Sequence, residues 1–196
     1  METLIKSPIE KYPIRFNYSV DFIPGELITN LTLTCVNAAT GVSTKTTIID
    51  SETNSSPEIV VVLKAGTEGD EHHIQSVITT NLGNSYQRDL LLAIQTVVSD
   101  SFGKQPSDRV LFDVDFTRRL ETGDTVFSGS VLATKESDGS DVSATVIPLV
   151  EVLSPRVGVH TAAGDDLETY LLGVRATTNA EYVYEKPVRM NVQEIP

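Results

Sequence analysis

The chain is poor in the residues that usually mark a cross-linked or catalytic protein. Its 196 residues include one cysteine, three histidines, no tryptophan and only 6% aromatic residues. A single cysteine excludes an internal disulfide framework. Cys35 lies in a strand-like run, so we expect a small buried thiol there rather than a reactive one. Without tryptophan, the core is predicted to be mostly aliphatic.

Basic residues are scarce as well. The chain has 15 Lys and Arg against 27 Asp and Glu, which gives a net charge of -12. Residues 1–97 hold 6 basic and 11 acidic residues, and residues 98–196 hold 9 and 16, so the halves carry -5 and -7. Binding to nucleic acid or to an anionic membrane needs clusters of Lys and Arg. We therefore expect no nucleic acid and no membrane among the partners.

Long hydrophobic runs are also missing. No apolar stretch reaches the roughly 18 residues of a membrane-spanning helix. The first residues lack the basic region and apolar run that are typical of a signal peptide. The sequence therefore predicts neither a membrane span nor secretion.

What the chain does have is a pattern of short β-strands. Residues 14–19 alternate apolar and polar, and residues 59–63 form a continuous apolar run of strand length. About seven such segments per half, with turns every ~8–12 residues, are typical of a β-sandwich. Residues 1–11 have no clear period and are interpreted as an N-terminal arm. We expect a strand over residues 42–49 and a polar loop over residues 50–57, and no segment of this half shows a convincing helical stripe.

An internal repeat organises the chain. The turn that starts at Gly66 and runs on to Thr-Thr-Asn recurs 98 positions later, at Gly164. Sixteen identities fall at this one ungapped offset, concentrated at turn glycines and prolines and at strand ends, where backbone geometry restricts the choice of residue. The repeat predicts two tandem domains, 1–98 and 99–196, each of the size of an immunoglobulin (Ig) type module. The predicted fold class is all-β, with two tandem Ig-like antiparallel β-sandwich domains. The predicted structural turn positions are Gly25, Gly66, Gly123 and Gly164.

The histidines do not form a catalytic pattern. His72 aligns with Tyr170 of the second copy, so the position requires a bulky, partly polar residue. His73 falls on the opposite face of the same segment and is expected to be exposed. His160 aligns with Val62, which indicates a packing position. A nucleophile or acid–base pair held in a pocket is not evident. We predict no catalytic residue and no cofactor, and the protein is not expected to be an enzyme.

Two carboxylate pairs, Asp113/Asp115 and Asp165/Asp166, have the oxygen ligands that a hard cation prefers. The first pair is replaced by Arg15 and Asn17 in the other half, and the EF-hand spacing is missing. Exposed acidic surface is therefore the favoured interpretation, and no metal site is predicted. A Gly-rich phosphate loop, a Cys/His metal spacing and a Gly-x-Ser-x-Gly elbow are missing from the sequence too.

The order of motifs in each half is a Gly turn, a β-rich strand and a second Gly turn that leads to Thr-Thr-Asn. In this respect the chain resembles the Ig-like modules of tailed-bacteriophage virion proteins, some of which are fibre–tail adaptors. The motifs that carry the resemblance are FIPGELI at residues 22–28 and GTEGDEH at residues 66–72, with LETGDTV at residues 120–126 and GDDLETY at residues 164–170.

The resemblance implies a non-enzymatic structural or adaptor protein of a virion, made in the host cytoplasm. It would lie at the head–tail connector or the tail, as a homo-oligomeric ring that contacts portal, tail or fibre subunits. A capsid decoration protein or a tail-tube protein is the alternative within this class. A carbohydrate- or receptor-binding β-sandwich is the alternative from another class. It would need exposed aromatic residues, and only Tyr182 and Tyr184 lie near one another.

Overall fold

The computed structural model of the chain describes residues 2–98 and 100–194. It divides into two compact units, Met1–Thr96 and Val97–Pro196, called unit 1 and unit 2 below. The expected boundary after residue 98 stays a prediction, because residue 99 lies outside the described residues.

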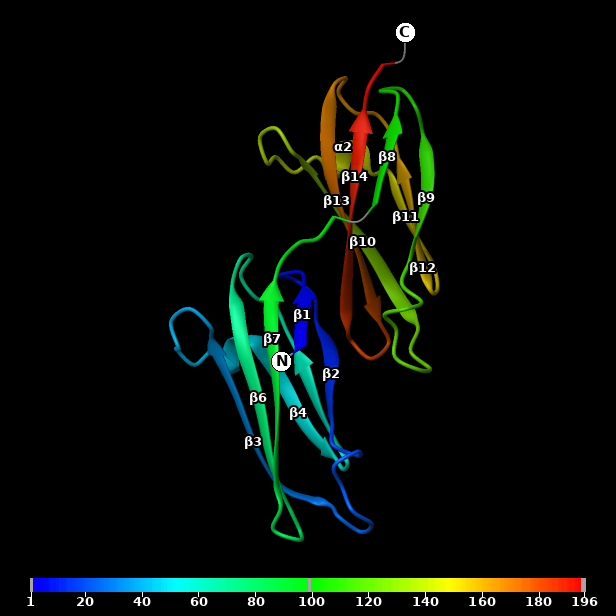
Figure 1. The fold of residues 1–196 in the computed structure, drawn as a ribbon. Coiled ribbons are helices and arrows are strands. Elements are labelled where there is room, and N and C mark those ends of the chain that lie inside the picture. Colours follow the sequence, from blue (N-terminus) through cyan, green and yellow to red (C-terminus); the bar gives the residue numbers. More distant parts are fainter. Residues whose placement is uncertain (1, 99, 195–196) are drawn as a thin grey trace. The chain divides into compact units, whose positions relative to one another are not determined.

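Unit 1 contains seven strands and one short helix (Figure 1). They are β1 (Glu2–Lys6), β2 (Tyr12–Asn17), β3 (Ile28–Asn37), α1 (Lys45–Ile48), β4 (Ile49–Ser55), β5 (Glu58–Leu63), β6 (Glu71–Thr80) and β7 (Ser85–Ile94). The strands form a four-stranded sheet in the order β1-β7-β6-β3 and a three-stranded sheet in the order β2-β5-β4. All pairs are antiparallel except β1 and β7, which run parallel.

Unit 2 repeats this plan. Its elements are β8 (Asp100–Lys104), β9 (Val110–Asp115), β10 (Val126–Lys135), α2 (Ser143–Val146), β11 (Leu149–Leu153), β12 (Arg156–Thr161), β13 (Glu168–Thr178) and β14 (Val183–Val192). The sheet orders are β8-β14-β13-β10 and β9-β12-β11, the same as in unit 1. Most element bounds differ from those of unit 1 by 98 residues. The Ser56-Pro57 and Ser154-Pro155 peptide bonds are both cis. The predicted all-β fold of two tandem Ig-like sandwiches is confirmed.

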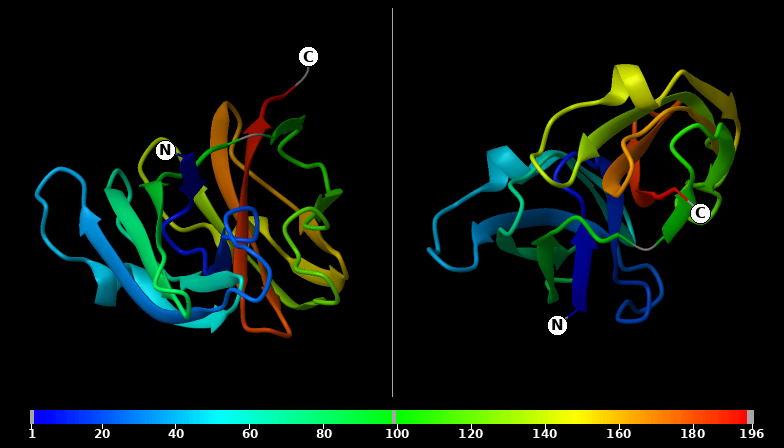
Figure 2. Two further views of the ribbon diagram at one scale, coloured as in Figure 1. Left: turned by 60° about the horizontal axis from the view of Figure 1, so that its bottom comes forward. Right: turned by 90° about the horizontal axis from the view of Figure 1, so that it is seen from above.

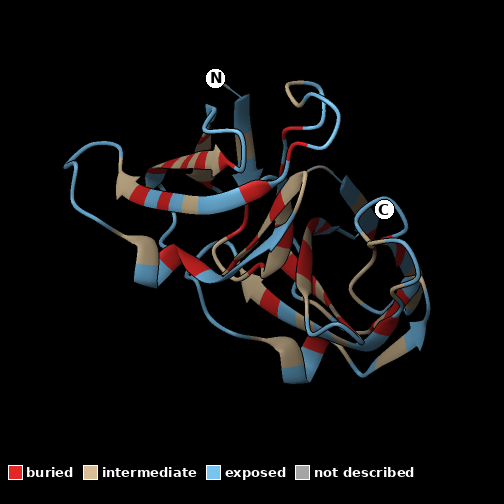
Figure 3. Cartoon of the chain, turned by 90° about the horizontal axis from the view of Figure 1, so that it is seen from below, coloured by how far each residue is buried: buried red, intermediate tan, exposed pale blue. Residues whose placement is uncertain are grey.

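The core of each unit lies between its two sheets, as the facing ribbons in Figure 2 show. Buried and exposed residues alternate along the strands (Figure 3), the pattern of a sheet with one face on a core. In β5, Ile59, Val61 and Leu63 are buried and alternate with half-buried residues. Cys35 belongs to this core and is 1% exposed, as expected for a packing thiol. The core is mostly aliphatic, as the composition predicts.

Three expectations for unit 1 are wrong. Residues 2–6 are not part of an arm but form β1, which pairs with β7 over its whole length. Residues 50–55 are not a loop but belong to β4. Both are edge strands with mainly exposed side chains, so neither has an apolar period. The strand expected over residues 42–49 is not formed, because residues 45–48 are one turn of α-helix, too short to produce a helical stripe.

Candidate functional site

The first Gly turn holds a buried carboxylate network in unit 1. Gly25 has φ of +83°, a left-handed conformation that glycine adopts without steric cost. This turn places the Glu26 side chain among hydrogen-bond donors: Thr80 Oγ1 at 2.7 Å, Asn84 Nδ2 at 2.9 Å and the Ile23 amide at 3.0 Å. Burial raises the pKa of Glu26, but these hydrogen bonds outweigh it and hold the pKa below its ordinary value.

The second copy of this turn is built differently. Gly123 has φ of +85°, so the backbone is the same. Asp124 stands in place of Glu26 and is one methylene shorter. Its Oδ1 accepts hydrogen bonds from the amides of Thr125 and Ala180, at 2.9 and 3.4 Å. Its Oδ2 is buried with no hydrogen-bond partner in the described part of the chain. The turn is therefore duplicated, but the carboxylate network is not.

The second Gly turn is a site of close packing. Gly66 has no left-handed φ, and a Cβ there would lie 3.1 Å from Ile94 Cδ1. Its amide donates to Pro8 O at 2.8 Å, which fixes the β1–β2 loop on the turn. In unit 2, a Cβ on Gly164 would lie 2.9 Å from Val192 Cγ2. Both glycines thus allow the chain to approach the last strand of their unit.

Further along this turn, the two copies differ at one strained position. Gly69 has φ of +86°, and its counterpart Leu167 has φ of +61° with 79% of its surface exposed. A side chain in this conformation costs roughly 1–2 kcal/mol. Unit 2 therefore has the same left-handed turn conformation as unit 1, although leucine disfavours a positive φ.

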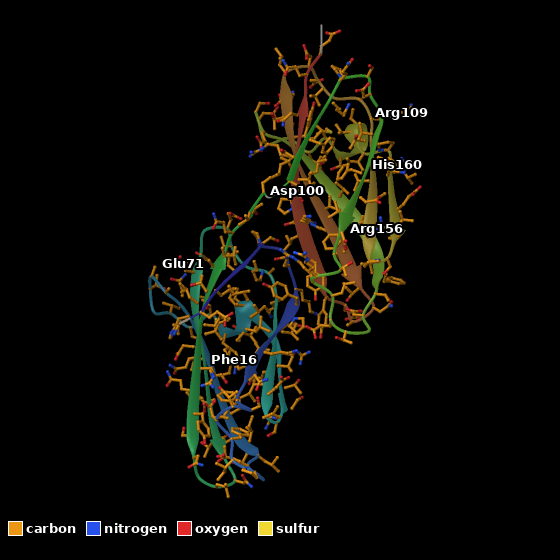
Figure 4. All side chains as sticks on the ribbon, turned by 45° about the vertical axis from the view of Figure 1, so that its right-hand side comes forward. Phe16, Glu71, Asp100, Arg109, Arg156 and His160 are labelled. Carbon is orange, nitrogen blue, oxygen red and sulfur yellow. The ribbon has the colours of Figure 1, made fainter. Side chains whose placement is uncertain are left out.

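The histidines occupy packing and surface positions. His72 and Tyr170 occupy equivalent positions in the two units. Both are 2% exposed, as expected for a position that requires a bulky side chain. His72 Nδ1 lies 3.0 Å from Thr44 Oγ1, and burial lowers the pKa of His72. His73 is half-buried rather than exposed, with Nε2 at 3.2 Å from Asp89. His160 is half-buried on β12 (Figure 4), with Nε2 at 3.4 Å from Glu151.

The two acidic pairs have protein partners of their own. Asp113 pairs with Arg156 at 3.2 Å, and Asp115 accepts from the Thr117 hydroxyl at 2.6 Å. Asp165 pairs with Lys135 at 2.9 Å. Across residues 2–98 and 100–194, no three His, Cys, Asp or Glu side chains are grouped so that they could hold a metal ion.

The pair of tyrosines that a sugar-binding platform would need is not available. Tyr184 is 3% exposed and belongs to the core of unit 2, so only the half-buried Tyr182 reaches the surface. Among the described residues, no helix is long and apolar enough to cross a membrane.

A groove that no sequence motif predicts opens in unit 1. It has a volume of about 500 Å³ and runs between the edge strand β2 and the neighbouring strands β1 and β7. Phe16, labelled in Figure 4, is one of its lining residues. The apolar lining residues come from strands far apart in the sequence, so no local motif marks the groove. The signal that could have found it is the comparison of the two repeats at the positions of Leu4 and Ile14, which are phenylalanines in the second copy.

Comparison with known proteins gives one family. The model of the podophage GP4 fiber-tail adaptor protein gp77 matches residues 6–93 and again residues 104–191, two segments that are also 98 positions apart. No curated protein matches the chain at a significant level.

Solved structures with tandem Ig domains are similar to this chain at low identity. A chimeric titin Z1Z2-Z1Z2 tandem is 9% identical, covers 98% of this chain and 96% of its own, and has a TM-score of 0.37. A chimeric titin Z1Z2 is 10% identical, with 99% and 94% covered and a TM-score of 0.36. The Ig1-2 module of the Drosophila receptor protein tyrosine phosphatase DLAR is 8% identical, with 98% and 95% covered and a TM-score of 0.31. Likeness at this level says nothing about function.

Proposed function

Because the chain belongs to the family of the podophage GP4 fiber-tail adaptor protein gp77, we propose that it is a non-enzymatic structural adaptor at the head–tail connector or tail of the virion. There it links a ring to fibres or to neighbouring subunits, as one copy of a homo-oligomeric ring. The observation that carries the proposal is the family match to both repeats, over residues 6–93 and 104–191.

The fold supports a role in assembly. Each unit has two open sheets, and in the described residues their end strands are β1, β3, β2 and β4 in unit 1 and β8, β10, β9 and β11 in unit 2. Edge strands offer backbone donors and acceptors to a partner strand. In a ring, many copies of one modest contact act together, because each added contact forms at a high effective concentration.

Side chains on the unit 2 edge strand β11 support the same role. Leu149, Val152 and Leu153 are 48%, 40% and 47% exposed. Large apolar side chains on an open strand edge are typical of an interaction surface, since they lose contact with water when a partner covers them. The equivalent strand of unit 1, β4, has Ser51 and Ser55 at the positions of Leu149 and Leu153.

Electron microscopy of the parent particle tests the proposal. We expect density for this chain between the portal and the tail or at the base of the fibres. Density on the shell would instead identify a decoration protein, and density along the tube a tail-tube protein. A particle without the chain would contradict all three. A glycan array is the cheaper control, where clear binding would favour a sugar-binding protein instead.

A further inference from the structure

The groove in unit 1 has the size and lining of a peptide site. Its volume of about 500 Å³ lies within the roughly 300–1,000 Å³ typical of binding clefts. Its apolar lining residues come from three strands: Leu4 from β1, Pro13, Ile14 and Phe16 from β2, and Leu90 from β7. Every residue of β2 contributes to the wall, so the groove follows this strand along its length.

The strands beside the groove are incompletely paired. β2 is the end strand of its sheet, where the constant-type Ig plan has a further strand, as in the order ABED. On the other wall, β1 pairs with β7 only from Leu90 to Ile94. The Ile94 amide bonds to Asp70 O, and bonded pairs alternate along an antiparallel ladder, so Gln87 and Asp89 direct their backbone groups away from β6. The groove therefore offers sheet edge as well as apolar surface.

Two differences in unit 2 work against a groove at the same place. Phe102 and Phe112 stand at the positions of Leu4 and Ile14, and their rings pack with centroids 4.8 Å apart. Pro187 stands at the position of Asp89 and has no amide hydrogen to offer a partner strand. Since the two units share one sheet plan, we expect this closure by side chains to distinguish unit 2 from unit 1.

The charges along the groove select the kind of partner. Arg88 pairs with Asp21, and Arg15 pairs with Glu58 at 3.4 Å, so each of these cations already faces a carboxylate. Two further acids line the groove, Glu2 and Asp89. Asp89 accepts hydrogen bonds from the amide groups of Gln75 and Gln87, at 3.0 and 2.7 Å, and lies near His73. Successive side chains of β7 point to opposite faces, so Asp89 lies on the face away from Leu90, whereas Glu2 pairs with Leu90 and lies on the inner face. A cationic side chain on the partner that points to the outer face would complement Asp89.

We propose that this groove accepts one extended strand of another virion protein, with apolar side chains at alternate positions and, between them, a lysine or arginine that faces Asp89. The inference rests on the proposed adaptor function. Alternate side chains of an added strand point to one side, here toward Leu4, Ile14 and Leu90. A second copy of this chain is the poorer occupant, because two molecules of net charge -12 repel each other.

Nuclear magnetic resonance of the isotope-labelled full chain tests the proposal with two synthetic probes of about eight residues, long enough to span β2. One alternates lysine and valine, and the other alternates glutamate and valine. We expect the lysine probe to shift the amide signals of β2 and of Gln87 and Asp89. Absence of shifts with the lysine probe, equal binding of both probes, or shifts confined to β3 and β4 would overturn the proposal.

Swapping side chains between the units provides matched variants. Leu4→Phe with Ile14→Phe brings the unit 2 closure into unit 1, and we expect at least about tenfold weaker binding of the lysine probe. Phe102→Leu, Phe112→Ile and Pro187→Asp together should create a second set of shifts in unit 2. Unshifted signals elsewhere establish that each variant is folded. The proposal is contradicted if Leu4→Phe with Ile14→Phe binds the lysine probe as tightly as the unmodified chain. It is also contradicted if the triple variant of unit 2 binds no probe.

The two proposals fail separately. A chain that is present at the tail but binds neither probe contradicts only the strand-acceptor groove. A chain absent from the particle contradicts the adaptor function, whatever the probes do. Sedimentation of the unmodified chain tests whether a second copy of the chain occupies the groove. If the chain self-associates and Leu4→Phe with Ile14→Phe abolishes the association, the groove binds a second copy and the inference is overturned.

Discussion

In the middle of unit 1, the Tyr18 hydroxyl lies 3.0 Å from the Ser76 carbonyl oxygen and 2.9 Å from the Ser76 hydroxyl, all in a buried setting. At the same two positions unit 2 has Phe116 and Val174, which are 1% and 0% exposed. One unit fills the site with a hydrogen-bonded pair and the other with two apolar side chains. The backbone plan thus tolerates either solution, provided that both partners change together.

The same contrast holds for other pairs. Ile78 in β6 corresponds to Ala176 in β13, and both are fully buried. The Glu26 network corresponds to the shorter Asp124, and Gly69 corresponds to Leu167. The shared backbone is therefore maintained by the turns and the strand pairing, while the side chains that fill the interior differ between the two units. Exchanging the side chains at these equivalent positions between the two units tests the contrast.

The largest expected effect is in the core. Ile78→Ala should destabilise unit 1 by about 2–5 kcal/mol, because it leaves a cavity in a fully buried position. The reverse change, Ala176→Ile, should cost unit 2 about 1–3 kcal/mol through overpacking. Residue-resolved hydrogen exchange of the full chain reports each unit separately. A cost below about 1 kcal/mol for Ile78→Ala would mean that unit 1 can repack at this position.

The next effect is the buried hydrogen bond. Tyr18→Phe should cost about 1–3 kcal/mol, since it leaves the Ser76 hydroxyl buried without this partner. Tyr18→Phe combined with Ser76→Val, the unit 2 solution, should cost less than the sum of the single changes. Denaturant unfolding of the four proteins of this cycle measures the coupling. Strict additivity would refute the idea that the two residues act as a pair.

A smaller effect is expected at the strained turn. Leu167→Gly should stabilise unit 2 by about 0.5–1 kcal/mol, because glycine adopts a φ of +61° without strain. The matched change Gly69→Leu should destabilise unit 1 by roughly 1–2 kcal/mol. Thermal unfolding that shows both signs would establish that strain, rather than side-chain contact, distinguishes the two turns. The opposite sign for Leu167→Gly would contradict this account.

The smallest expected change is in acid sensitivity. The pKa of Glu26 is lower in the folded state than its ordinary value of 4.5, so the ionised carboxylate stabilises unit 1 above that value. This stabilisation is lost as the pH falls through the folded pKa. Glu26→Gln should lower stability at neutral pH and flatten the acid dependence of unit 1, while unit 2 in the same sample keeps its own profile. An unchanged slope would show that the network does not depend on charge.

Much of the fold was predictable from the sequence because the two repeats encode the same backbone with different side chains. Identities at turn positions such as Gly25 and Gly123 survive where backbone geometry restricts the residue, so they mark the turns directly. The edge strands β1 and β4 were not predictable, because most of their side chains face solvent and show no apolar period. No local motif predicts the groove, because its lining comes from two sheets; only a comparison of Leu4 and Ile14 with the phenylalanines of the second copy points to it.

In each unit the first and last strands lie side by side and run parallel: β1 with β7, and β8 with β14. Tension applied through the two ends of a unit therefore pulls these strands past each other in opposite directions. All hydrogen bonds of the ladder then bear load at the same time, instead of opening one after another as in a peeled hairpin. We therefore expect each unit to resist tension along the chain until its whole ladder breaks at once.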